Sequence, residues 1–233
     1  MTVPTSSSLH ESVYSGNGMG QHYTNPEHDV VRRALGLAEE ISNPRVLDLA
    51  CGRGIVSLTL AREKAAEHIV AGDINDEGLQ DLEERADNEV LEIDVKKVDA
   101  ADKDGFPADI GDEFDMVVAK DLYPFLDPRQ GQNMLQNVSN SLRSGGWLLV
   151  TAPSTRSQLF TESIALGQNE LYRKLGEAAK AHVQTSLDFF TFTDIERLAE
   201  QLRSVNLEMT EASHYGRANG WIAAIAQKYS VKE

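Results

Sequence analysis

The chain has 233 residues, of which 41% are hydrophobic, and its 37 Asp and Glu against 22 Lys and Arg give a formal net charge of −15. This length and composition predict one globular domain and exclude an intrinsically disordered chain. No apolar run approaches the roughly 18 residues of a membrane helix, and such an acidic surface disfavours nucleic acid as a partner. A single cysteine and a polar start without secretory-signal features indicate a cytoplasmic protein.

Beyond an N-terminal arm, apolar residues at helical spacing alternate with short apolar runs, which predict helices and strands in turn. Residues 1–26 are rich in Ser, Gly, Thr and Asn without apolar periodicity, so we expect an irregular arm before a domain at 27–233. The expected helices span residues 27–40, 55–64, 77–88 and 130–142. The expected strands span residues 46–50, 68–73, 114–119 and 146–151, with one more inside 90–98. Repeated βα units predict an α/β fold, a doubly wound and mostly parallel sheet with helices on both faces.

The C-terminal third departs from this alternation. Residues 157–183 carry apolar residues at helical spacing and predict one or two helices within an inserted segment or cap at 157–192. The elements expected after it are one helix and two strands, at 193–205, 207–212 and 221–227. The turn signal Asn219-Gly220 joins the two strands, so we expect the chain to end in an antiparallel hairpin.

A glycine-rich turn between a strand and a helix carries the strongest chemical signal. Residues 46–54, Val-Leu-Asp-Leu-Ala-Cys-Gly-Arg-Gly, place Gly52 and Gly54 where absent side chains let backbone N–H groups approach a ligand. Asp73 follows about 20 residues later, at the end of the second strand, where a carboxylate can accept both ribose hydroxyl protons of an adenosine-containing cofactor. Strand, turn, helix and acid together predict a nucleotide-type pocket.

Two cofactor classes share this geometry. A dinucleotide places an anionic pyrophosphate on the helix N-terminus and usually needs a third small residue, Gly or Ala, where this chain has Ser57. Asp48, inside the strand, is expected to point toward the same site, where its charge opposes a pyrophosphate and suits a cationic ligand. S-adenosylmethionine (SAM) carries a sulfonium and an ammonium, so the pattern favours SAM over a nicotinamide dinucleotide.

From about residue 27 to 227 the sequence resembles the class I SAM-dependent methyltransferases, which implies a Rossmann-like sheet with an antiparallel C-terminal hairpin. The resemblance rests on the glycine motif, on acids after the second and third strands, and on the segment 142–147, similar to the family's helix-to-strand turn before the fifth strand. It implies contacts with the methionine part, the ribose and the adenine of SAM. The implied cofactor-binding residues are Asp48, Ala50, Gly52 and Gly54 at the methionine part, Asp73 at the ribose, Ile74, Asp99 and Ala100 at the adenine, and Lys120 after the fourth strand.

Methyl transfer is an in-line displacement, so positioning and exclusion of water carry most of the catalysis and a general base is optional. The candidate bases are His22, Asp121 and His182. His22 lies on the arm, which in the family often folds over the cofactor, so a lid of Tyr14, His22 and Tyr23 competes with a plain surface tail. For Asp121 a helix cap or cofactor contact is the alternative, and for His182 a place in the core.

Further polar residues are candidates for the acceptor side. Arg156 after the fifth strand and Arg217 in the last hairpin can meet an anionic acceptor, with ordinary surface roles as the alternative. Cys51 has no partner cysteine and is expected to be a packing residue. No His/Cys cluster has metal-ligand spacing, so no metal is expected. The expected substrate-binding residues are Tyr14, Tyr23, Tyr123 and Arg156.

The segment 157–192 lies where the family commonly builds its acceptor pocket, and no separate recognition domain is evident. Together with the acidic composition, this favours methyl transfer to an O or N atom of a small molecule over DNA, RNA or a large protein. Three alternatives stay open: a SAM-binding regulatory or scaffold module without turnover, a nicotinamide-dependent oxidoreductase, and non-methyl chemistry on the same fold. The sequence specifies neither the acceptor nor the oligomeric state.

Overall fold

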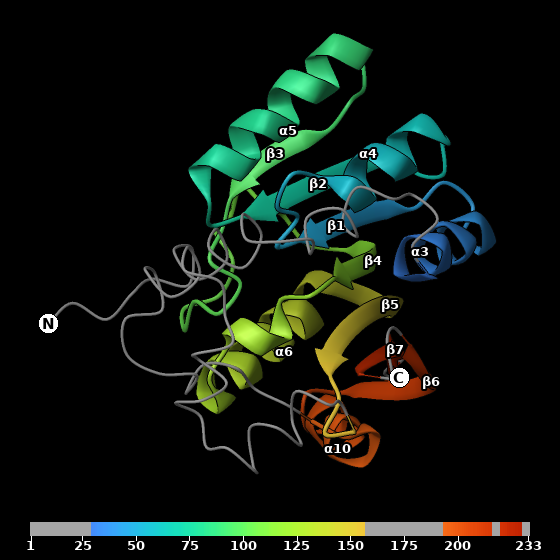
Figure 1. Cartoon of the computed structure of the whole chain (residues 1–233), viewed down its shortest axis with the longest axis vertical. Coiled ribbons are helices and arrows are strands. Elements are labelled where there is room, and N and C mark those ends of the chain that lie inside the picture. The colour runs from blue at the N-terminus through green and yellow to red at the C-terminus, as the bar shows by residue number, and fades with distance from the viewer. Residues whose placement is uncertain (1–28, 157–192, 216–219, 230–233) are drawn as a thin grey trace, which may run out of the picture.

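The computed structural model describes residues 29–156, 193–215 and 220–229 (Figure 1). These residues contain one seven-stranded sheet in the order β3-β2-β1-β4-β5-β7-β6. The strands are β1 (Arg45–Leu49), β2 (His68–Asp73), β3 (Asp94–Lys97), β4 (Phe114–Ala119), β5 (Leu142–Pro153), β6 (Leu207–Tyr215) and β7 (Trp221–Lys228). Strand β7 runs antiparallel to β5 and β6, and the other neighbouring strands are parallel. The predicted α/β fold, mostly parallel with an antiparallel C-terminal pair, is confirmed.

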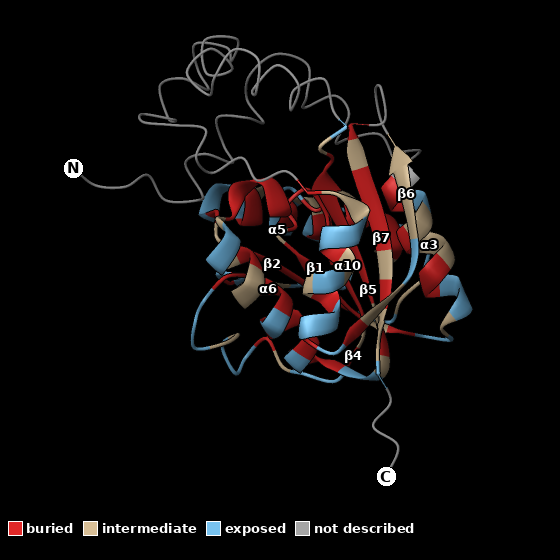
Figure 2. Cartoon of the chain, turned by 90° about the horizontal axis from the view of Figure 1, so that it is seen from below, coloured by how far each residue is buried: buried red, intermediate tan, exposed pale blue. Residues whose placement is uncertain are grey.

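Helices cover both faces of the sheet, as the repeated βα units predict. The helices are α3 (Asp29–Glu40), α4 (Ile55–Arg62), α5 (Asp76–Glu89), the 3₁₀ helix η1 (Tyr123–Phe125), α6 (Pro128–Ser141) and α10 (Ile195–Ser204). Helices α3 and α4 pack on one face, and α5 extends this layer over β2. Helices α6 and α10 pack on the opposite face, where they close the largest apolar cluster. Figure 2 shows the strands as mostly buried between the two layers.

Side-chain caps determine where two of the helices begin. The Asn75 side chain accepts the N–H groups of Glu77 and Gly78 at 2.9 and 3.2 Å, so α5 begins at Asp76, one residue before the expected start. The Asp127 side chain accepts the Gln130 N–H, and the Gln130 side chain accepts the Asp127 N–H, which is a capping box. Helix α6 therefore begins at residue 128 and not at 130.

The helix-to-strand turn expected before the fifth strand is a bulge inside β5 instead. This strand begins at Leu142, directly after α6 ends. Phe114 of β4 pairs with Leu142, and Met116 pairs with Trp147. Between these two pairs the chain advances by two residues on β4 and by five on β5, so β5 contains extra residues. Gly145, inside this bulge, has a φ of 77°. The glycines that indicated a turn therefore let the strand bulge without leaving the sheet.

Several predicted features lie outside the described residues. These are the arm with Tyr14, His22 and Tyr23, the inserted segment 157–192 with His182, and Arg217 and Asn219 of the last hairpin. The division into an arm, a domain at 27–233 and a cap therefore stays a prediction. Among the helices of the described residues, none has the length and apolar character needed to cross a bilayer.

Candidate functional site

The chain leaves β1 through a turn in which three residues have positive φ. The φ angles are 58° at Ala50, 55° at Gly52 and 75° at Gly54. Because glycine adopts this left-handed conformation without a steric penalty, the turn itself requires the two predicted glycines. A Cβ on Gly54 would also lie 2.3 Å from a methyl carbon of Leu82, so the turn packs directly on α5.

Asp73 lies at the end of β2, as predicted, and its side chain is buried. Its Oδ2 accepts the Gly52 N–H at 2.8 Å, and its Oδ1 accepts the Asn75 N–H at 2.9 Å. The sequence pattern predicts that the Gly52 N–H faces a ligand, whereas the structure shows that it donates to this carboxylate. Since a carboxylate oxygen can accept about two hydrogen bonds, each oxygen of Asp73 keeps room for a ligand hydroxyl.

A pocket opens beside Asp73, past the carboxyl ends of β1 to β4. The pocket is open to solvent, and the empty space in it, counted together with the adjoining solvent, is about 420 Å³. The described residues that line it are Ala50, Asp73, Ile74, Val98, Asp99, Ala100, Leu122, Phe125 and Leu126. Five of the predicted cofactor residues thus line one pocket. The sequence analysis missed the other four, which are Val98, Leu122, Phe125 and Leu126. Three of these four follow β4 in or beside η1, where a short 3₁₀ helix has no apolar periodicity to detect.

Asp48 is not among these lining residues. Its Oδ2 accepts both the N–H and the hydroxyl of Ser57, at 3.0 and 2.5 Å, so the carboxylate binds the first turn of α4. Burial raises the pKa of Asp48 from 3.8 to about 6, although the two Ser57 bonds and the charge of Lys120 act in the opposite direction. Contact of Asp48 with the methionine part of a cofactor stays a prediction.

Lys120 and Asp121 form a buried ion pair just after β4. Asp121 has a φ of 57°, and its N–H donates to the Thr151 hydroxyl at 2.7 Å. The same hydroxyl donates to Asp121 Oδ1 at 3.0 Å, while the Lys120 ammonium donates to Oδ2. The sequence analysis missed Thr151, whose only signal is a hydroxyl in an otherwise apolar strand segment. Neither Lys120 nor Asp121 is among the residues that line the pocket.

The remaining candidates are not among the described residues that line the pocket. The Tyr123 hydroxyl donates to the Gln201 side chain of α10 at 2.6 Å, and burial raises the pKa of this phenol. Arg156 is exposed at the last described position before the inserted segment. Cys51 is buried among apolar side chains, as expected of a packing residue, and burial raises the pKa of its thiol. Within residues 29–156, 193–215 and 220–229, no group of three His, Cys, Asp or Glu side chains is arranged to hold a metal.

The pocket suits the ribose and the base of a nucleoside. Asp73 offers fixed acceptors for vicinal hydroxyls, and apolar walls such as Ile74 and Val98 suit a flat ring. The charged side chains among its described lining residues, Asp73 and Asp99, are both acidic. Fold and site therefore define an α/β protein with a pocket suited to a nucleoside.

Comparisons with known proteins agree with this reading. Residues 46–146 match the family described as "Methyltransferase domain". Among solved structures, TehB from Haemophilus influenzae is 19% identical with a TM-score of 0.58, and the match covers 84% of this chain but only 62% of that one. The magnesium protoporphyrin IX methyltransferase from Synechocystis PCC 6803, solved with bound SAH, is 14% identical with a TM-score of 0.67, covering 94% and 93%. A SAM-dependent methyltransferase from Clostridium acetobutylicum ATCC 824 is 14% identical with a TM-score of 0.65, covering 95% and 97%.

At these identities the structural matches show the fold, and no curated protein matches the sequence. The family match identifies residues 46–146 as a methyltransferase domain, and the solved structures show that the chain shares the fold of SAM-dependent methyltransferases, as the sequence resemblance implied. The methyltransferase domain supports SAM as the cofactor, and the acidic pocket beside Asp73 fits it.

Proposed function

We propose that the protein transfers the methyl group of SAM to an oxygen or nitrogen atom of a small molecule. The observation that carries the proposal is the acidic, apolar-walled pocket at the carboxyl ends of the parallel strands. When bound, SAM supplies a methyl group already activated by positive sulfur. The chain then has to bind its two ligands, align them and exclude water, which is where most of the rate enhancement of such a displacement arises.

The proposed cofactor residues divide by the part of SAM that they meet. Asp73 accepts the ribose hydroxyls, because its two oxygens are already fixed by backbone N–H groups. Ile74 and Ala100 pack against the adenine, and Asp99 meets its edge; all three line the same pocket. The proposed contacts with the methionine part come from Ala50, Asp48, Gly52, Gly54 and Lys120.

Asp121 is the proposed general base for an acceptor hydroxyl or amine. Its carboxylate is buried directly after β4, and Thr151 and Lys120 each hold one of its oxygens, so its position is fixed before any acceptor arrives. A base that is fixed in advance costs little reorganisation during the reaction. His22 remains the second proposed base, and Tyr14, Tyr23, Tyr123 and Arg156 are the proposed acceptor-binding residues.

A small acceptor is favoured by the net charge of −15, which disfavours the phosphate backbone of nucleic acids. We also retain the proposal of a cytoplasmic protein, supported by its single cysteine.

The test is a screen with SAM labelled in its methyl group against small hydroxyl, amine and carboxylate compounds, followed by kinetics on the best acceptor. For a hydroxyl or amine acceptor, Asp121→Asn should lower kcat by about 100-fold, the usual contribution of a general base. The matched control Asp112→Asn, on an exposed loop, should leave kcat unchanged. Transfer restricted to a nucleic acid or a protein would contradict the small-molecule proposal, and an unchanged kcat in Asp121→Asn would remove the base.

A further inference from the structure

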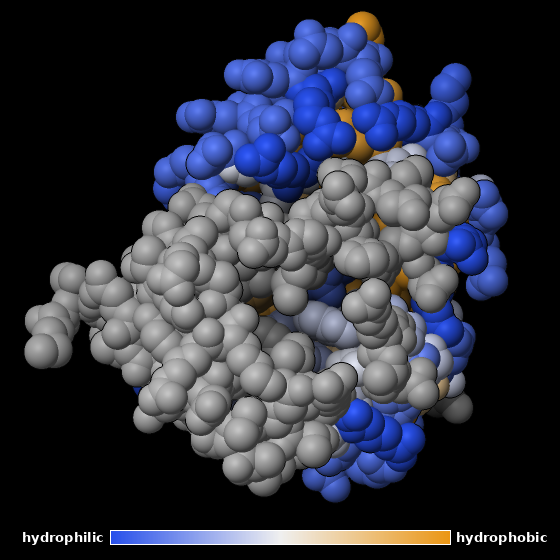
Figure 3. All heavy atoms as spheres, in the orientation of Figure 1, coloured by the Kyte–Doolittle hydropathy of each residue, from blue (hydrophilic) through white to orange (hydrophobic). Residues whose placement is uncertain are grey.

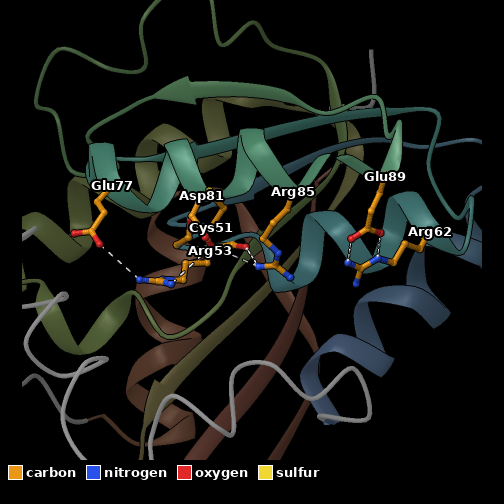
Figure 4. A network of polar contacts seen from close by, with 8 residues as sticks. Cys51, Arg53, Arg62, Glu77, Asp81, Arg85 and Glu89 are labelled. Atoms are coloured by element: carbon orange, nitrogen blue, oxygen red, sulfur yellow. Dashed lines mark hydrogen bonds and ion pairs between the residues drawn. The ribbon is translucent and has the colours of Figure 1, made fainter. Parts of the chain in front are cut away.

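A network of charged side chains lies across the glycine turn and the outer face of α5 (Figure 4). Arg85 of α5 donates from Nη1 to the backbone oxygen of Arg53, in the middle of the turn, at 2.9 Å. The Arg53 guanidinium lies 3.7 Å from Glu77 and 3.9 Å from Asp81, and Asp81 lies 3.7 Å from Arg85. Figure 3 shows that hydrophilic side chains cover this end of the molecule, over α5. One backbone carbonyl of the turn is thus bound by a charged donor from the neighbouring helix.

Below this network the backbone of α5 touches the same turn. A Cβ on Gly78 would lie 3.0 Å from the backbone oxygen of Gly52, so only glycine allows this approach without a shift. The Gly52 N–H is held by Asp73 at 2.8 Å. The consecutive peptide groups around Gly52 and Arg53 are therefore fixed at three points, by Asp73, by α5 backbone packing and by Arg85.

We propose that Arg85 is a positioning residue for the cofactor, which acts by holding the Arg53 carbonyl and with it the glycine turn in the conformation that binds SAM. The inference rests on the proposed use of SAM at this turn. Glycine residues lose more conformational freedom on ordering than any others, and a turn left loose must be ordered when the ligand binds. Arg85 orders the turn beforehand without lining the pocket itself. Asp81, one helical turn earlier, orients the guanidinium of Arg85.

An ion pair between α4 and the last residue of α5 provides a matched control. Arg62, the last residue of α4, donates from Nε and Nη2 to Glu89, the last residue of α5, at 2.6 and 2.5 Å. Figure 4 shows this pair at the opposite end of α5 from the glycine turn. Replacing Arg62 thus removes an Arg-carboxylate bridge between α4 and α5 without touching the turn. Methionine is the suitable replacement in both variants, because it keeps an unbranched apolar stem and loses the donors.

The experiment is calorimetric titration of the full chain with S-adenosylhomocysteine (SAH) for the wild type, Arg85→Met and Arg62→Met. We expect Arg85→Met to raise the Kd for SAH about fivefold, the effect of one partly exposed charge-assisted hydrogen bond, and Arg62→Met to leave it unchanged. The wild-type Kd should also rise more steeply with added salt than that of Arg85→Met, because salt screens the exposed charges. Without SAH, the backbone amides of residues 50–54 should exchange faster with deuterium in Arg85→Met than in Arg62→Met.

An unchanged Kd in Arg85→Met, or an equal rise in both variants, would overturn the inference while leaving the proposed function intact. Equal exchange of the turn amides in the two variants would overturn it as well, whatever the Kd. Failure of the wild type to bind SAH would instead refute the proposed function, and the inference with it.

Discussion

Replacing Asp48 by Asn tests whether burial outweighs the Ser57 hydrogen bonds in setting the pKa of this carboxyl. Burial raises the pKa of this carboxyl from 3.8 to about 6, so its ionised form is less favourable in the folded state than in the unfolded chain. A rise of about two units corresponds to about 3 kcal/mol of lost stability at pH 7. At pH 5 the Asp48 carboxyl of the folded protein is mostly protonated, and the loss falls to about half of that value. The stability that depends on protonation of Asp48 is fully present below pH 3.8 and is lost as the pH rises through about 6.

The assay is urea unfolding of the wild type and Asp48→Asn at pH 7 and pH 5. The amide oxygen of Asn can still accept from Ser57, so the variant keeps the contact and lacks the titration. From pH 7 to pH 5 the wild type should gain roughly 1 to 2 kcal/mol in unfolding free energy relative to Asp48→Asn. The control Asp112→Asn, exposed on a loop, changes the net charge equally and should show no such gain. A relative loss of wild-type stability at pH 5 would show that the Ser57 bonds outweigh burial, and would refute the reasoning.

Three further predictions concern stability and use the same unfolding measurement. Phe114→Ala removes a fully buried ring of the main apolar cluster and should cost about 3 to 5 kcal/mol; a cost under 1 kcal/mol would contradict its place there. Gly36→Ala meets nothing within 4 Å on α3 and should stabilise by roughly 0.5 to 1 kcal/mol, whereas Gly78→Ala crowds a backbone oxygen and should not; equal gains would refute the close approach. Thr151→Val leaves a buried N–H unpaired and should cost about 1 to 3 kcal/mol, a loss that Thr151→Ser should avoid.

The sheet was predictable because its strands are short apolar runs set between helical patterns. The predicted strand at 114–119 matches β4, and that at 68–73 matches β2. The start of β5 was not predictable, because the bulge exists only through pairing with β4 and its glycines also suit a turn. The start of α6 was missed for a local reason, since the capping box around Asp127 was overlooked as a start signal.

The site was predictable where a residue's role follows from its place in a βα unit. Asp73 was found from its distance to the glycine turn, and the structure places it beside the pocket. The partners of these residues were not predictable, because they come from elsewhere in the chain. The bond from Gly52 to Asp73, the turn of Asp48 toward Ser57 and the Thr151 contact all depend on how neighbouring strands and helices pack.

The most direct test of the central claim is calorimetric titration of the wild type and Asp73→Ala with SAM, SAH and NAD. We predict that the wild type binds SAM and SAH and does not bind NAD. Asp73→Ala should weaken the binding of both sulfur ligands by at least about 30-fold, because it removes the two charge-assisted hydrogen bonds that we propose to the ribose. Binding of NAD alone, or equal affinity of Asp73→Ala and the wild type for SAH, would contradict the claim that this pocket is the SAM site.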